Sequence, residues 1–323
     1  MIDIKTLGRD VIAGKRVTRE EAAALYSLPL EPLCQTANEI RESVCANGFD
    51  LCTIINGKSG KCTEDCRFCA QSAFHRTASA EYPLLSADVI AAQAKINADQ
   101  GVLRYSIVTS GKRLSNSEVT LVCEAVRKIR SETSISVCVS LGLLNAEQYG
   151  RLREAGATRV HNNLETSRRY FPKICTTHTY DDKIAAIRAA QEAGLSVCSG
   201  GIMGLGETWE DRIDMALTLR ELGIKSVPVN MLNPIPGTPL ERSARLTMED
   251  MRRIVAVYRF LLPDASIRLA GGRGLLADKG RSCFLSGANA AISGDMLTTA
   301  GITTDADKAM LHHLGFEVKR DHE

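Results

Sequence analysis

Short apolar runs rich in β-branched residues alternate along the chain with longer amphipathic segments. The short runs predict strands, and the longer segments, where apolar residues recur every three or four positions, predict helices. We place strands at residues 51–56, 103–108, 135–140, 158–162, 196–200, 226–231, 266–270 and 289–292. Between them we expect helices at residues 86–100, 116–131, 145–155, 180–193, 208–222 and 247–261. Residues 1–50 have a helical pattern, and Thr18-Arg19-Glu20-Glu21 resembles a capping box.

This repeated alternation of strand and helix is typical of a parallel sheet. Eight such strands indicate a closed barrel rather than an open doubly wound sheet. The fold class that we predict is α/β, a (β/α)8 TIM-type barrel with an N-terminal helical extension. A length of 323 residues fits a single barrel domain over 1–323, with N-terminal helices over about 1–45 and the barrel over about 46–318.

The two faces of several predicted strands differ in polarity. In the run 135–140, Ser136, Cys138 and Ser140 alternate with Ile and Val residues. Other strands have corresponding polar or sulfur-bearing positions at Cys52, Arg104, Ser106, Ser196, Cys198, Ser226, Asn230 and Arg268. A packed barrel interior is normally made of Val, Ile and Leu. If the apolar faces meet the outer helices, the other faces line a polar cavity inside the barrel.

Composition and charge exclude several classes of protein. Hydrophobic residues make up 44% of the chain, which is ample for a core. The formal net charge is +2 with both signs interspersed, so we expect no nucleic-acid partner. The chain has no long apolar run and no apolar signal core near its start, so we expect a cytoplasmic protein that does not enter a membrane. Eleven cysteines in such a chain indicate metal or redox chemistry rather than disulfides.

Three cysteines follow the first predicted strand in one short polar loop: Cys62, Cys66 and Cys69, with the spacing C-x3-C-x2-C. Such a loop can bring three thiolates to one face of an iron–sulfur cluster. An ordinary cubane takes four ligands, so one iron would stay open to a ligand that is not protein. A zinc site and unrelated cysteines are the alternatives, but structural zinc usually has a fourth Cys or His in a compact module, and none is close by.

Three further cysteines, Cys52, Cys138 and Cys198, occupy inward positions on different predicted strands, with Arg268 nearby. Taken alone, each is equally well explained as a small buried hydrophobe. An arginine and several serines would be costly neighbours in a purely apolar core, so together these residues favour a second metal cluster. Cys175 and Cys283 could approach a site, but we favour a structural role for them, as for the remaining cysteines. We interpret the histidines, including His161 and His178, as polar contacts or surface residues.

The spacing of the cysteine loop is the signature of the radical S-adenosylmethionine (SAM) enzymes, and the rest of the chain resembles the biotin synthases among them. Similar segments follow in one order between about residues 45 and 318: 161–167, 198–208, 226–240, 267–273, 286–289 and 297–301. The resemblance implies sulfur insertion that converts dethiobiotin to biotin. It also implies a [4Fe-4S] cluster whose open iron binds SAM, an auxiliary iron–sulfur cluster that donates sulfur, and a homodimer.

The resemblance assigns roles to individual residues. The [4Fe-4S] cluster would be held by Cys62, Cys66 and Cys69. Positions near SAM match Phe68, Asn163, Glu165, Gly201 and Gly204. Positions near dethiobiotin match Asn163 and Asn230 at its ureido ring and Thr298 and Thr299 at its carboxylate. The residues expected at the reacting groups are Arg268, Asn163 and Asn230.

The sequence departs from the common family pattern at Ser106, where the family usually has a cysteine. That cysteine, with the residues matching Cys138, Cys198 and Arg268, holds a [2Fe-2S] cluster. Our hypothesis is that Cys52 substitutes, so that Cys52, Cys138 and Cys198 are the ligands. Three thiolates on different strands can hold a four-iron cluster with an extra sulfide. Arg268 would then donate a hydrogen bond to sulfide instead of binding iron.

Two other functions remain open on the sequence. A related barrel enzyme, of the hydrogenase-maturase or methylornithine-synthase kind, would share the cysteine loop, but Asn230 and Thr298-Thr299 argue against it. An electron carrier or cluster-storage protein would leave Glu165 and the glycine-rich run 200–206 unexplained. The resemblance further implies a small electron donor of the flavodoxin or ferredoxin type and the iron–sulfur assembly machinery as partners.

Overall fold

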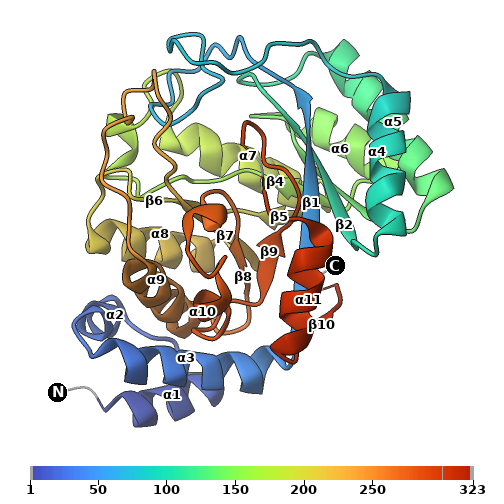
Figure 1. The fold of residues 1–323 in the computed structure, drawn as a ribbon. Helices are drawn as coiled ribbons and strands as arrows, with labels where there is room; N and C mark the ends of the chain where they lie inside the picture. The colour runs from blue at the N-terminus through green and yellow to red at the C-terminus, as the bar shows by residue number, and fades with distance from the viewer. Residues whose placement is uncertain (1–2, 300, 321–323) are drawn as a thin grey trace.

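In the computed structural model, which describes residues 3–299 and 301–320, eight parallel strands form a closed barrel (Figure 1). Their order is β1-β2-β3-β4-β5-β7-β8-β9, and β1 pairs with β9 to close the ring. The strands are β1 Gly48–Lys58, β2 Arg104–Thr109, β3 Ser136–Ser140, β4 Arg159–His161, β5 Ser196–Cys198, β7 Ser226–Met231, β8 Ser266–Leu269 and β9 Ala290–Ile292. The predicted barrel and its eight strands are confirmed.

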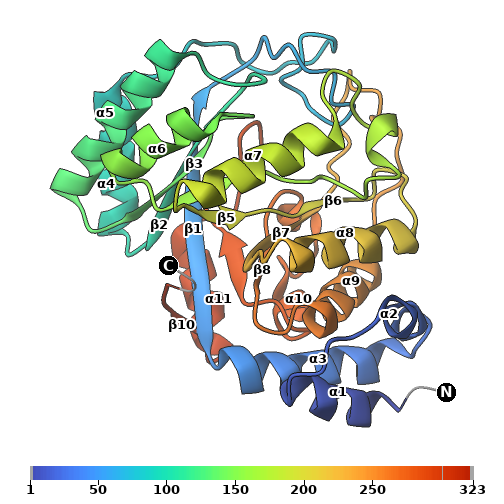
Figure 2. The ribbon, with the colours of Figure 1, turned by 180° about the vertical axis from the view of Figure 1, so that it is seen from behind.

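Helices cover the outside of the barrel, as Figure 2 shows from behind. The six predicted between strands are present, each within one residue of its predicted ends: α4 Ala87–Asp99, α5 Asn116–Glu132, α6 Ala146–Ala155, α7 Tyr180–Glu192, α8 Trp209–Glu221 and α9 Met248–Leu261. Each begins after a Ser, Thr or Asn whose side chain accepts a hydrogen bond from the third helical N–H. These caps satisfy donors that the helix itself leaves unpaired, which is why the boundaries were predictable from the sequence.

The N-terminal helices α1 Ile4–Ile12, α2 Arg19–Tyr26 and α3 Leu30–Cys45 lie at the end of the barrel opposite the loop that follows β1 (Figure 1). Thr18 and Glu21 form the predicted capping box. The prediction of helix up to residue 50 was wrong, because the backbone turns at Ala46, which has a φ of +54°. β1 then starts at Gly48, and Phe49 packs edge-on against Phe284 at the core.

Several short elements have no counterpart in the predictions: β6 Gly201–Met203, β10 Glu317–Val318, the 3-10 turns η1 Phe171–Lys173 and η2 Arg273–Leu275, α10 Arg281–Phe284 and α11 Thr304–His313. β6 pairs with β7, and β10 pairs with the start of β1. Most of these elements have only two to four residues, too few for a recognisable periodic pattern of apolar and polar residues. The division of the chain at about residue 45 within one domain stays a prediction. Among the described helices none is long and apolar enough to cross a membrane.

Candidate active site

A cavity of about 380 Å³ occupies the inside of the barrel. Its walls come from the strands and from the loops that follow β1, β7 and β9, so it lies at the carboxyl ends of the strands, where barrel enzymes have their active sites. Most of the predicted site residues line it: Cys52, Phe68, Cys69, Cys138, Asn163, Glu165, Cys198, Asn230, Arg268, Thr298 and Thr299. The predicted difference in polarity between strand faces is therefore confirmed.

Cys52, Cys138 and Cys198 project from β1, β3 and β5 into this cavity, and each is at most 6% exposed. Burial raises the pKa of Cys52, and it raises the pKa of Cys138 to about 11; Cys198 lies close enough to both to add to each shift. Ser106 faces Cys138 across the β2–β3 pair. Ser226 Oγ donates to Cys198 Sγ at 3.2 Å. The structure thus brings together the three thiols of the predicted ligand set.

Arg268 connects these thiols to a buried carboxylate. Its Nη1 donates to Cys52 Sγ at 3.1 Å, and its Nη2 lies 3.1 Å from Asp50 Oδ2. Arg159 and Arg104 approach the same oxygen at 3.4 and 3.7 Å. Burial alone would raise the pKa of Asp50, but the three guanidinium groups outweigh it, and the pKa is lowered. Sequence reasoning missed Asp50, although it has the same strand parity as Cys52, because the predicted strand began at residue 51 whereas β1 begins at Gly48.

Asn163 and Glu165 follow β4 and are held by a chain of hydrogen bonds. Ser140 Oγ lies 3.0 Å from His161 Nδ1, and His161 Nε2 lies 3.0 Å from Asn163 Oδ1. Burial and the charge of Lys183 lower the pKa of His161 to about 4. The ring is therefore neutral near pH ~7 and carries one N–H, which fits donation from Nε2 to the amide oxygen and acceptance from Ser140.

The amide of Asn163 is consequently oriented with its nitrogen toward Glu165, and Nδ2 donates to Glu165 Oε2 at 3.3 Å. Glu165 has a φ of +69°, which is uncommon for a residue with a side chain. Hydrogen bonds from Glu165 N to Gly200 O at 3.0 Å and from Ile202 N to Glu165 O at 2.9 Å hold it there. Strained residues of this kind concentrate at ligand sites.

Gly201 and Gly204, predicted to lie near the nucleoside, are not among the residues that line the cavity. A Cβ on Gly201 would come within 2.3 Å of the Glu165 carbonyl oxygen, so only glycine lets β6 approach this segment so closely. Gly204 has a φ of +98°, and its N–H donates to Glu207 Oε1 at 2.9 Å. Gly201 thus supports Glu165 from behind the cavity, and contact of either glycine with SAM stays a prediction.

Asn230 is fixed by its neighbours and still has hydrogen-bonding capacity. Its Nδ2 donates to Gly201 O at 3.0 Å, and its Oδ1 accepts from Gly271 N at 2.8 Å. An amide has two N–H donors and two acceptor lone pairs, so one of each remains for a ligand. Thr298 and Thr299 lie exposed where the cavity opens, and Ala300 of the same matched segment lies outside the described residues.

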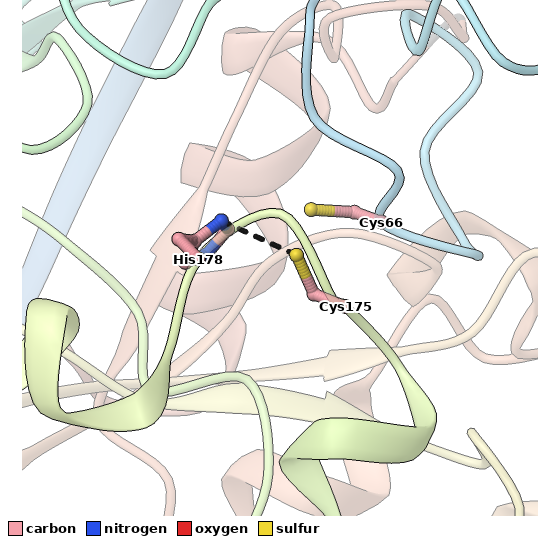
Figure 3. A group of neighbouring side chains, drawn as sticks. All are labelled: Cys66, Cys175 and His178. Carbon is pink, nitrogen blue, oxygen red and sulfur yellow. Dashed lines mark hydrogen bonds between the residues drawn. The ribbon is translucent and has the colours of Figure 1, made fainter.

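The cysteine loop after β1 closes over the cavity. Backbone hydrogen bonds from Cys62 N to Gln71 O at 3.0 Å and from Ala73 N to Cys62 O at 2.8 Å pin its two ends together. Cys69 lines the cavity, whereas the thiol of Cys66 is directed toward Cys175 and His178 (Figure 3). Three thiols on one short loop are a donor set that fits a cluster with three protein ligands, and Cys66 would join it by a change of side-chain rotamer.

Comparison with known proteins identifies the family. Residues 58–232 match the model of the radical SAM superfamily, and residues 228–317 match that of the biotin and thiamin synthesis associated domain. A biotin synthase of Brachyspira hyodysenteriae is 59% identical over 318 residues, which are 98% of this chain and 96% of that protein. The chain belongs to the biotin synthase family. Biotin synthase 2 of Corynebacterium diphtheriae is 55% identical over 320 residues, 99% of this chain and 97% of that protein.

The predicted identity as a radical SAM enzyme of the biotin synthase family is thereby confirmed. Among solved structures, a methylornithine synthase superposes with a TM-score of 0.83 at 22% identity, covering 97% of both chains. The hydrogenase maturase HydG gives the same TM-score at 18% identity, covering 99% of this chain and 76% of that one. At such low identity these two structures show a shared fold, and the family follows from the full-length biotin synthases.

Proposed function

We propose that this biotin synthase converts dethiobiotin to biotin with an auxiliary cluster held by Cys52, Cys138 and Cys198. The observation that carries the proposal is the convergence of these three thiols in the cavity, while the usual cysteine position on β2 has only the hydroxyl of Ser106. Thiolates are the ligands of iron–sulfur clusters, and none of the three is engaged in a disulfide.

In this proposal the cavity would have a metal cluster at each of two ends and a substrate region between them. When bound, the [4Fe-4S] cluster with SAM supplies the radical that removes hydrogen, and the auxiliary cluster supplies sulfur. Cys62, Cys66 and Cys69 would hold the first cluster over the cavity, and the three interior cysteines the second at its floor. With both clusters and both organic ligands bound, the barrel walls would shield the space between the clusters from water, which would protect a reactive carbon-centred radical.

Polar side chains along the wall would orient the two organic ligands. Glu165, held by Asn163, would accept hydrogen bonds from the ribose hydroxyls of SAM, with Phe68 beside the adenine. The donor and acceptor that Asn230 keeps free would pair with the ureido ring of dethiobiotin. Thr298 and Thr299 would meet its carboxylate where the cavity opens. Such positioning brings the reacting carbon between the two clusters before the reaction begins.

Arg268 would act as a hydrogen-bond donor to cluster sulfur and not as an iron ligand. Its guanidinium already donates to Cys52 Sγ and pairs with Asp50. A protonated guanidinium has no lone pair to give to iron. Hydrogen bonds to the sulfurs tune the potential of a cluster, and the two remaining arginines on Asp50 keep this geometry fixed. We infer that the auxiliary cluster has four irons and an extra sulfide.

Iron and acid-labile sulfide counts on anaerobically purified protein test the ligand set. Cys52→Ala is expected to lose the iron and sulfide of the auxiliary cluster, to keep the cluster of the loop, and to form no biotin. Cys34→Ala removes an equally buried thiol from α3, and Ser106→Ala removes the hydroxyl at the usual ligand position; both are expected to match the wild type. Unchanged iron in Cys52→Ala would show that Cys52 is not a ligand.

The family resemblance also carries proposals about partners. An electron donor of the flavodoxin or ferredoxin type would reduce the first cluster, and the iron–sulfur assembly machinery would rebuild the second after it has given up sulfur. A homodimer in the cytoplasm completes the proposal. Mass measurement by light scattering on the cluster-loaded protein tests the dimer, and a monomeric mass would overturn it.

A further inference from the structure

A second set of metal-binding side chains lies behind the cysteine loop, away from the barrel cavity. Cys66, Cys175 and His178 bring one sulfur or nitrogen atom each to within 4.8 Å of one another (Figure 3). Cys66 comes from the loop after β1, and the other two come from the segment between η1 and α7. Neither Cys175 nor His178 is among the residues that line the barrel cavity.

The surroundings of His178 hold its ring in place. Its Nδ1 lies 3.2 Å from Cys175 Sγ and 2.5 Å from Glu64 Oε2, and its ring packs edge-on against Phe171. Thr177 Oγ1 donates to the same Glu64 oxygen at 2.8 Å. The side chains of His178 and Glu64 are only 5% and 8% exposed. Within the described part of the chain, His178 Nε2 is buried without a hydrogen-bond partner.

We propose that Cys66, Cys175 and His178 bind one divalent transition-metal ion of the zinc or ferrous type. Two thiolates and an imidazole are ligands that such ions prefer, and the Glu64 carboxylate beside the ring can fill a fourth position. Ligand atoms at about 2.0–2.3 Å from a tetrahedral ion lie roughly 3.5 Å from one another, so the present gathering needs only small shifts. Binding releases the protons of both thiols.

This site and the loop cluster exclude each other because both use Cys66. That part of the inference rests on the proposed role of Cys66 in holding the [4Fe-4S] cluster. A chain without the cluster would keep Cys66 on the single ion, turned away from Cys62 and Cys69. The chain with the single ion bound is therefore a resting form, and it must release this ion before the [4Fe-4S] cluster can assemble on the loop.

Titration of the full-length, reduced, cluster-free chain with Co²⁺ alone tests the site. The parent variant carries Cys62→Ala and Cys69→Ala, which removes the alternative three-thiolate site on the loop and keeps Cys66. Adding Cys175→Ala or His178→Ala to this parent is expected to abolish the binding of one Co²⁺ ion per chain. The loss is measured as a decrease in the thiolate-to-cobalt charge-transfer absorption. The loss of affinity should exceed the roughly 10–100-fold that outer-shell partners of a metal contribute.

The controls separate this site from the other cysteines. Cys283→Ala in the same parent removes a buried thiol far from the loop and should leave the titration unchanged. All of these variants keep Cys52, Cys138 and Cys198, so any Co²⁺ bound there contributes equally to each titration and does not affect the difference between variants. Circular dichroism confirms folding, and His178→Gln replaces His178→Ala if the latter unfolds. Equal Co²⁺ binding by the parent and both added variants would overturn the site.

A last titration tests exclusivity. With the loop cluster reconstituted in both, wild type and Cys175→Ala should bind the same amount of Co²⁺, because the cluster already uses Cys66. A Co²⁺ ion that reconstituted wild type binds and reconstituted Cys175→Ala does not would overturn the sharing of Cys66. Iron counts on Cys52→Ala are independent of this result, so failure of the single-ion site and failure of the proposed function are distinguishable.

Discussion

At the scale of single residues, the candidate SAM site depends on a glycine that does not touch the cavity. Gly201 pairs with Glu165 as an isolated bridge, and a side chain at this position would collide with the Glu165 carbonyl and with Met215 Sδ at 2.6 Å. Glu165 has a left-handed backbone and so has little freedom to yield. The contact therefore fixes where its carboxylate can lie.

Replacing Gly201 with alanine tests this support. Gly201→Ala is expected to weaken SAM binding by at least roughly tenfold, about the free energy of one net hydrogen bond. Equilibrium dialysis of SAM against the cluster-loaded protein measures it. Gly150→Ala on α6 is the matched control, since a Cβ there meets nothing within 4 Å and should leave binding unchanged. Wild-type affinity in Gly201→Ala would show that Glu165 is not positioned by this contact.

At the scale of secondary-structure elements, Asp211 ties helix α8 to the segment that follows Glu165. It is the N3 residue of the α8 capping box with Thr208, and its side chain is fully buried. Its Oδ1 also accepts from Ser167 Oγ at 2.5 Å and from Arg169 Nε at 3.1 Å. One carboxylate thus caps a helix and anchors the loop beyond β4.

The ionisation of Asp211 predicts a pH-dependent contribution to stability. Burial would raise its pKa, but hydrogen bonds from Ser167 and Thr208 and the charge of Arg169 outweigh burial and lower the pKa below that of an ordinary aspartate. A carboxylate whose pKa is lower in the folded chain than in the unfolded chain stabilises the fold at pH values above its unfolded pKa of about 3.9. This stabilisation is lost as the pH falls through the folded pKa.

Asp211→Asn should therefore lower the free energy of unfolding by about 1.5–3 kcal/mol near neutral pH, with the gap from wild type shrinking below about pH 4. Urea unfolding across this pH range measures it. Asp264→Asn breaks the exposed Lys225–Asp264 pair and should cost at most about 1 kcal/mol. A gap for Asp211→Asn that stays constant with pH would contradict the assignment to ionisation.

At the scale of the whole molecule, the interior cysteines lie on strands far apart in the sequence. β1, β3 and β5 are separated by whole strand–helix units, yet closure of the ring brings Cys52, Cys138 and Cys198 to one cavity. A cluster bound to all three would cross-link the barrel from within. Because such a ligand binds the folded chain alone, it stabilises that state.

Removing the clusters should consequently lower the melting temperature. Differential scanning calorimetry under anaerobic conditions is expected to show a fall of several degrees after iron chelation of the wild type. Cys198→Ala should show a smaller fall, because its auxiliary cluster is already lost, while Cys123→Ala, which removes a thiol of α5, should behave as wild type. Identical falls in Cys198→Ala and wild type would argue against cross-linking by the auxiliary cluster.

The sequence by itself determined the barrel, the N-terminal helices and the family. Strand and helix periods, polar N-caps and strand parity are local patterns, and parity alone placed Cys138 and Arg268 inside the barrel. The cysteine loop and the ordered family segments likewise stand in the printed sequence. Most boundaries agreed closely with the structure because caps act within one helical turn.

Only the tertiary structure decided which distant groups meet. The convergence of Arg104, Arg159 and Arg268 on Asp50 depends on the register of strands around a closed ring. The approach of Cys175 and His178 to Cys66 depends on how two loops pack. The need for glycine at position 201 depends on its close contact with the backbone of Glu165. Periodicity reports which side of an element is buried, but it does not report what that side contacts, and for this reason these three features could not be read from the chain.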